Sequence, residues 1–445
     1  MMVGRDAPEW DGAAAGDAHA LAAHVGDTRG HPRALCLLYI AEHAPALRDA
    51  AARAAADTAR HETHNVQLYI AAAELAHVAP DAAWIEATTK HVADEHEQLM
   101  AELRMYQNNM IDESVRMAHS DLGDHFVRTG RFSDALLNYD KAREYSTTHE
   151  HMLEANMRAM YAAHCLRVPD AAAAYADKAA LALHALPPTV LPGHNDAWRA
   201  VLASGSAGIC ARSGSGATTD TDVRAQIDAR IRAVRTLALW EICDASAVLP
   251  AVDAGDGTGS ADIVPPALLA WLAALGALSD PASTRAQRLA DDAAFKHLSE
   301  SDAGPRELVH AFLPGDMRRT LALVSAHAPA LALNPTLGAR VGHMLESITQ
   351  RMLARYLSAY RRISVGRLAR AFGWDDAHTR RELLTLALSG RLDVHIDWPA
   401  QTVALCESGA DTVARVLADG RATAQLRDRL VLSLRMEAAG HIVSS

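Results

Sequence analysis

The sequence predicts an all-α protein with one small β-hairpin: a right-handed TPR-like helical solenoid, then a winged-helix domain and a C-terminal tail helix. Three observations lead to this fold class. The chain of 445 residues is 50% hydrophobic but only 5% aromatic, and alanine, the strongest helix former, supplies much of the difference. Residues 103–145 match a helical repeat signature. Residues 364–405 pass from helical periodicity to the two-residue period of strands.

The tetratricopeptide pattern of about 34 residues fits the stretch from Leu103 to Tyr145. Its signature positions form a predicted repeat core, namely Leu122, Gly123 and Phe126 on one helix and Ala135, Tyr139 and Ala142 on the next. The tryptophan position of the pattern holds His119, and the proline position holds Thr147. One helix pair cannot bury its apolar face alone, so the pattern predicts stacked neighbouring pairs.

Local signals define this helix pair in more detail. The first helix carries an apolar stripe, which consists of Ile111, Val115, Ala118, Leu122 and Phe126. Gly130 is expected to end that helix in a left-handed conformation. Ser133 is expected to cap the second helix, with Phe132 and Leu137 as a hydrophobic staple. Gly123 and Ala135 are small where the two helices must approach closely.

The predicted repeat domain covers residues 33–334, after a mobile tail at residues 1–32 that is rich in Gly, Ala and Asp. Before the repeat we expect a helix at Val66–Val78 and another that Asp81 caps. Later helices are expected at 152–166, 171–186, 223–248, 268–278, 285–298 and 307–326. Gly-rich loops are expected near Ser204 and Asp253. The most apolar run, Val264–Leu278, is shorter than the roughly 20 residues of a membrane span and predicts a buried helix.

A winged-helix domain is predicted at residues 335–408. A long amphipathic helix from Leu337 to Leu357 precedes two short ones, which Ser364 and Asp375 are placed to cap. A hairpin of alternating residues follows, with apolar positions at Leu392, Val394, Ile396, Val403 and Leu405. Residues 409–445 then predict a tail helix with one stripe at Leu426, Leu430 and Leu434 and a second at Leu432 and Met436.

Charge and cysteine usage limit the function classes. The formal net charge of -11 argues against broad nucleic-acid binding, which needs clustered Lys and Arg. The five cysteines are scattered, odd in number and never in a C-x-x-C spacing, which indicates reduced thiols in the cytosol or nucleus. The N-terminus mixes Arg5, Asp6 and Glu9 without an apolar segment, so no secretory leader is expected.

Catalytic motifs are incomplete throughout the sequence. His149 and His151 supply the H-x-H of a metalloprotease, but the later serine and aspartate positions fall on Ala159 and Ala162. His61 and His64 are one residue too close for H-E-x-x-H. No G-x4-G-K or G-x-S-x-G sequence is present, and Gly255, Gly257 and Gly259 do not make G-x-G-x-x-G. We therefore expect no catalytic residue, cofactor or metal, and histidines that serve as core or surface residues.

A helical solenoid that leads into a winged helix and a tail helix is the layout of PCI-domain proteins. Several segments resemble the subunit-one family of the COP-nine signalosome in particular. They are Tyr39–Arg48, Asp81–Lys90, Asp112–Phe126, Ala135–Thr148, Leu353–Trp374 and Ser389–Asp397. The PCI subunit of the proteasome lid has the same architecture and remains an alternative.

The resemblance implies a non-catalytic scaffold, in the nucleus and cytoplasm, of a complex that removes a ubiquitin-like modifier from cullin-RING ligases. A zinc metalloprotease subunit elsewhere in that complex would do the chemistry. PCI subunits of the family pair through their winged helices and gather their tail helices into a bundle. Those roles fall here on the sheet from Leu392 to Leu405 and on the stripe Leu426, Leu430 and Leu434. Other signalosome subunits are the expected partners, and no membrane is.

A nucleic-acid-binding winged helix is the remaining alternative. His378, Arg380 and Arg381 on its second helix would point outward, toward a DNA groove. Asp375, Asp376 and Glu382 lie in the same segment and would repel phosphate, which favours a solvated or protein-binding face.

Overall fold

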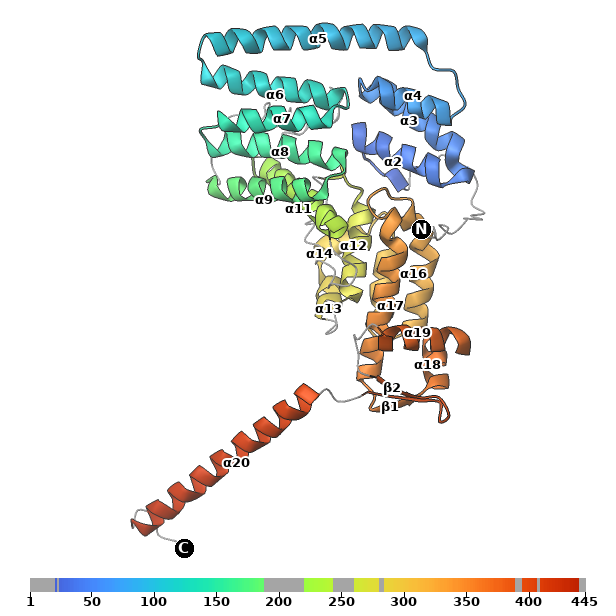
Figure 1. Cartoon of the computed structure of the whole chain (residues 1–445), viewed down its shortest axis with the longest axis vertical. Coiled ribbons are helices and arrows are strands. Elements are labelled where there is room, and N and C mark those ends of the chain that lie inside the picture. Colours follow the sequence, from blue (N-terminus) through green and yellow to red (C-terminus); the bar gives the residue numbers. More distant parts are fainter. Residues whose placement is uncertain are drawn as a thin grey trace. The chain divides into compact units, whose positions relative to one another are not determined.

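The computed structural model describes residues 21, 24–187, 220–242, 260–279, 284–388, 394–405 and 409–439. The chain divides into two compact units, Met1–Thr349 and Gln350–Ser445. Figure 1 shows the elements of each unit. The predicted loops near Ser204 and Asp253, the glycines Gly255 to Gly259 and the residue Leu392 lie outside the described residues.

The first unit is built from helices. They are α2 (Gly30–His43), η1 (Pro45–Leu47), α3 (Arg48–Glu62), α4 (Val66–Leu75), α5 (Ala82–Asn108), α6 (Asp112–Arg128), α7 (Phe132–Glu144), α8 (His149–Leu166), α9 (Pro169–Ala185), α11 (Asp220–Ile242), α12 (Pro266–Leu278), α13 (Thr284–Asp291), α14 (Ala293–Leu298), α15 (Gly304–Phe312), α16 (Met317–Ala332), η4 (Gly338–Arg340) and the start of α17 (Val341–Ser358). Successive helices from α5 to α9 pack on one another, and Figure 1 shows α6 to α9 as stacked layers. This stacking confirms the predicted solenoid.

The core of this unit begins earlier than the sequence predicts. Leu21 is 6% exposed and Val25 2% exposed, and both pack in a cluster with Leu37 and Ile40 of α2. His31 at the start of α2 is also buried. The predicted tail at residues 1–32 is therefore too long at its C-terminal end, because alanine and small polar residues obscured the apolar positions.

Two predicted helices are in fact helix pairs. Residues 285–298 form α13 and α14, because the side chain of Asp292 accepts a hydrogen bond from the backbone of Ala294 and starts a new helix. Residues 307–326 belong to α15 and α16, where Asp316 caps the second helix through the Arg319 N–H. The helix α12 is buried from Leu268 to Leu278, as the run Val264–Leu278 predicts.

The second unit is a winged helix followed by the tail. It contains the end of α17, then β1 (Arg362–Ser364), α18 (Val365–Phe372), α19 (Asp376–Leu388), β2 (Val394–Asp397), β3 (Thr402–Leu405) and α20 (Gly409–Ala438). The three strands form an antiparallel sheet in the order β1-β3-β2. Ser364 caps α18 through the Arg367 N–H, and Asp375 accepts the His378 N–H at the start of α19, as predicted. The strand β1 was not predicted, because three residues are too few to show a period.

Not every local prediction holds in the repeat pair. Gly130 has a φ of +81° and ends α6 as expected, with the Arg131 N–H donating to the Phe126 carbonyl. The cap of α7 is Arg131, so Ser133 does not cap it. Leu137 is 61% exposed and Ile111 47% exposed, so the staple and the first position of the stripe are wrong.

Two of the five cysteines, Cys36 and Cys165, are free and buried. Cys210, Cys243 and Cys406 lie outside the described residues. Among the described helices, none combines the length and the hydrophobicity that crossing a membrane requires.

Candidate functional site

The repeat core is assembled as predicted between α6 and α7. Leu122, Phe126 and Tyr139 are each at most 5% exposed, and Gly123 is buried between the helices. Ala135 and Ala142 are fully buried on the facing helix. A Cβ added at Gly123 would lie 2.3 Å from Cε1 of Tyr139, so the tyrosine ring occupies the space that only glycine leaves open. These residues build the solenoid and leave no room there for a ligand.

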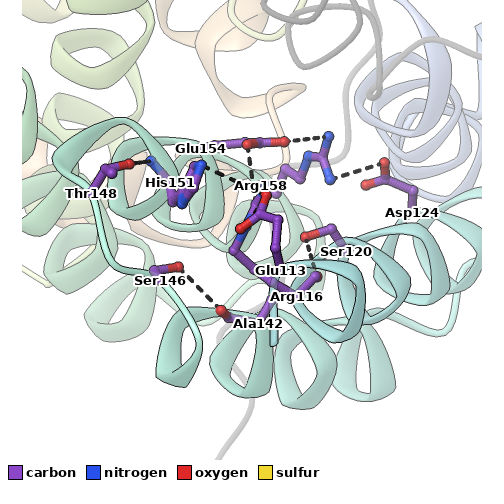
Figure 2. Close-up of polar contacts among 10 residues, drawn as sticks. All are labelled: Glu113, Arg116, Ser120, Asp124, Ala142, Ser146, Thr148, His151, Glu154 and Arg158. Atoms are coloured by element: carbon purple, nitrogen blue, oxygen red, sulfur yellow. Dashed lines mark hydrogen bonds and ion pairs between the residues drawn. The ribbon is translucent and has the colours of Figure 1, made fainter. Parts of the chain in front are cut away.

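An ionic network joins α6 to α8 beside this core (Figure 2). Arg158 contacts Glu154 at 2.9 Å and Asp124 at 3.4 Å, and its side chain is 10% exposed. Arg116 contacts Glu113 at 2.7 Å and the same Glu154 at 3.4 Å. Glu154 therefore bridges two nearly buried arginines, and each guanidinium has carboxylates from both helices. Such paired charges fix the register of two helices, since an unpaired charge here would be costly.

Asp124 also connects the network to the repeat core. The Tyr139 hydroxyl donates a hydrogen bond of 2.6 Å to Asp124 Oδ1. Burial raises the pKa of Asp124 above its ordinary value, while Arg158 and the tyrosine hydroxyl act in the opposite direction. Burial, together with the neighbouring Asp124, holds the pKa of Tyr139 well above 10, so the hydroxyl remains a donor. These contacts hold α6, α7 and α8 together.

The predicted sheet interface is only partly available as a surface. Val403 lies in the central strand opposite Ile363 and Ile396 and is 2% exposed, so it belongs to the core of the winged helix. Ile396 is half-buried on β2. Val394 and Leu405 are paired at the start of β2 and the end of β3. Within the described part of the chain, β1 and β2 are the edge strands of this sheet, and edges of this kind accept strands from neighbours.

Arg380 and Arg381 on the second helix of the winged helix are exposed, and Arg380 also contacts the hairpin. The Arg380 guanidinium stacks over Trp398 at 5.7 Å from the ring centroid. His378 packs edge-on against Trp374 at 5.0 Å and approaches Glu382 to 4.0 Å. Leu388 at the end of α19 is 86% exposed, so this helix shows an apolar side chain as well as charges.

The tail helix α20 exposes the stripe that the sequence predicts. Leu426, Leu430 and Leu434 are 58%, 64% and 63% exposed, and Leu432 and Met436 are also exposed. Every side chain from Thr423 to Met436 is exposed. A helix with two apolar stripes and no covering element for them within the described residues has its packing surface open to other chains.

One side-chain cluster was missed by the sequence analysis. His64, His91 and Glu95 place three possible metal-ligand atoms within 4.8 Å of one another. The spacing of His91 and Glu95, four residues apart on one helix face, is the signal that points to them. His64 comes from a separate loop, which the sequence does not bring to α5. His149 and His151 instead begin α8, where His151 lies 3.8 Å from Glu113.

Two protein-family models match separate parts of the chain. The protein-family model described as "26S proteasome subunit RPN7" matches residues 81–187, which contain α5 to α9. A model described as "PCI domain" matches residues 325–406, which hold α17, the two short helices and the sheet. The chain contains a PCI domain. The PCI match starts inside α16, ten residues before the predicted domain start at Pro335.

Curated relatives with the name COP9 signalosome complex subunit 1 are similar to this chain over segments of different length. The Arabidopsis thaliana protein is 24% identical over 321 residues, which is 71% of this chain and 64% of the relative. The Schizosaccharomyces pombe protein is 36% identical over 115 residues, 25% of this chain and 27% of the relative. Subunit 1b of Drosophila melanogaster is 40% identical over 73 residues, 16% of this chain and 14% of the relative. The matched segments thus span less than two thirds of these relatives.

Proposed function

We propose that this chain is a non-catalytic scaffold subunit of the COP9 signalosome. The relatives named subunit 1 of that complex support the proposal, and the Arabidopsis alignment extends over 71% of the chain. The PCI domain at residues 325–406 supports it as well. In this role the helices α5 to α9 form an arm, and the winged helix and the tail join the chain to sister subunits.

The observation that best supports the scaffold role is the exposed apolar stripe of the tail helix α20. It spans 30 residues, and its leucines at 426, 430 and 434 are all more than half exposed. Burying a leucine side chain contributes about 1.5–3 kcal/mol, so three such residues give a helix–helix contact a substantial driving force. The partner proposed for this stripe is a bundle of tail helices from other PCI subunits.

In this proposal the chemistry is done by a different subunit. The complex removes a ubiquitin-like modifier from cullin-RING ubiquitin ligases, and a zinc metalloprotease subunit performs the cleavage. This chain supports that subunit and the substrate ligases without contributing a reacting group. The nucleus and cytoplasm are the proposed locations, which fits the buried free thiols of Cys36 and Cys165.

The PCI subunit of the proteasome lid is the second candidate, because the model named after RPN7 matches residues 81–187. Affinity purification of the full-length protein from its native source, followed by mass spectrometry, separates the two candidates. Signalosome subunits in the eluate are the expected result. Recovery of proteasome lid subunits in their place would overturn the proposal in favour of the second candidate.

A winged-helix nucleic-acid binder is the third candidate and has weaker support. Arg380 stacks on Trp398, and the nearby acidic residues Asp375, Asp376 and Glu382 oppose phosphate. Titration with duplex DNA and with RNA at two salt concentrations tests it, since phosphate contacts make affinity fall steeply with salt. We expect no salt-dependent binding.

A further inference from the structure

Three side chains from two separate segments converge beside α5. His64 lies in the turn between α3 and α4, while His91 and Glu95 lie one turn apart on α5. One nitrogen of each histidine and one oxygen of Glu95 lie within 4.8 Å of one another. The two imidazole rings meet edge-on with centroids 5.6 Å apart. The loop is held in place because the His64 backbone N–H donates to the Arg128 carbonyl at 3.0 Å.

His64 also has a polar atom without a hydrogen-bond partner in the described part of the chain. Its Nδ1 is buried and has no hydrogen-bond partner among the described residues. A buried nitrogen without a partner costs free energy, about 1–3 kcal/mol for a neutral group. An ion bound between the two rings is one way to compensate for it, since a neutral imidazole nitrogen is a common metal ligand.

The contacts that Glu95 already makes leave acceptor positions on its carboxylate for a cation. Glu95 Oε1 accepts from Arg128 at 2.8 Å, and Oε2 contacts His125 Nδ1 at 3.0 Å. A carboxylate has about four acceptor positions, so two remain after these contacts. The His125 contact resembles the outer hydrogen bonds that orient metal-binding carboxylates. Arg128 opposes a cation, but its charge is already paired with Glu95.

We propose that His64, His91 and Glu95 form a binding site for one divalent transition-metal ion, with Zn²⁺ as the best-matched ion. Two imidazoles and one carboxylate are a recognised zinc ligand set with a fourth position open to water. Around a tetrahedral ion the ligand atoms lie about 3.4 Å apart, so any that are farther apart, up to 4.8 Å, must move closer. His91 is exposed and free to rotate toward the others. The bound ion would pin the turn before α4 to α5.

The test uses the full-length protein, freed of metal with a chelator and titrated with Zn²⁺ by calorimetry and with Co²⁺ by visible absorption. His91→Gln removes a ligand on an exposed side chain, and His184→Gln is the matched control, an exposed histidine on α9. Circular dichroism of each variant checks that the fold is kept.

We expect one equivalent of Zn²⁺ to bind the wild-type protein and the control equally, and to bind His91→Gln at least tenfold more weakly. The midpoint of thermal unfolding should rise with Zn²⁺ in the first two proteins and not in His91→Gln. Equal affinity in all three proteins would assign the binding to others of the 23 histidines and overturn the proposal. Absence of binding to the wild-type protein would also overturn it.

Discussion

The ring of Tyr139 lies directly against the backbone of Gly123. A Cβ at Gly123 would meet Cε1 of the tyrosine at 2.3 Å and Cδ1 at 2.7 Å. The tyrosine is 2% exposed, and its hydroxyl donates a hydrogen bond of 2.6 Å to Asp124, so the ring cannot easily move away from Gly123. The closeness of α6 and α7 thus depends on one missing methyl group.

Gly123→Ala should therefore destabilise the solenoid. Overpacking of a filled core costs about 1–3 kcal/mol, and this clash outweighs the gain in helix propensity of about 0.5–1 kcal/mol from replacing glycine. Urea unfolding of the full-length chain, followed by circular dichroism, measures the change in unfolding free energy.

Gly342→Ala on α17 is the matched control for that substitution. Nothing lies within 4 Å of a Cβ at Gly342, so the alanine should be neutral or stabilising by up to about 1 kcal/mol. If Gly123→Ala proved as stable as Gly342→Ala, the close packing of Tyr139 on α6 would be refuted.

His31 should make the protein sensitive to acid. Burial lowers the pKa of His31 to about 4, against an ordinary value of 6.5. Between pH 6.5 and 4 the unfolded chain takes up a proton that the folded chain does not. The stability that neutral His31 allows is therefore fully present above pH 6.5, and the free energy of unfolding falls as the pH decreases toward 4. The loss from this group at pH 5 is about 2 kcal/mol.

His31→Leu removes that titration and the buried Nε2, which lacks a hydrogen-bond partner among the described residues. The fall in unfolding free energy between pH 7 and pH 5 should be smaller in the variant by about 2 kcal/mol. The measurement is urea unfolding of both proteins at the two pH values. An unchanged pH dependence would mean that folding does not lower the pKa of His31.

The sequence was most informative where a residue acts within its own segment. Asp81, Ser364 and Asp375 each accept a backbone N–H at the start of a helix, as predicted from local patterns. Gly123 was identified as a close-approach position from the repeat signature alone. Local chemistry and a known repeat period determine these features, so one sequence is enough to find them.

Predictions failed where contacts between distant parts of the chain determine the burial or the partners of a residue. Ser133 satisfies the rules for a cap, but the cap of α7 is Arg131, two residues before Ser133. Val403 was assigned to the sheet interface with the other apolar hairpin positions, but it is buried in the central strand of a sheet whose β1 was not predicted. The bridge from Arg116 and Arg158 through Glu154, and the approach of His64 to α5, join segments that no local pattern relates.

The tail-helix proposal leads to a paired substitution experiment. A triple variant of the full-length chain, Leu426→Ser, Leu430→Ser and Leu434→Ser, removes the exposed stripe without touching the core. The control is Asp428→Ser with Arg435→Ser, two exposed charges elsewhere on the same helix that leave the net charge unchanged. Circular dichroism should show that the solenoid is folded in both variants.

The amount of signalosome subunits that co-purify with these tail variants shows most directly whether this chain joins a complex through α20. We expect the leucine variant to recover at least tenfold less of the sister subunits than the wild-type protein, while the charge variant recovers the wild-type amount. Equal recovery with all three proteins would contradict the claim that this chain enters its complex through the α20 stripe.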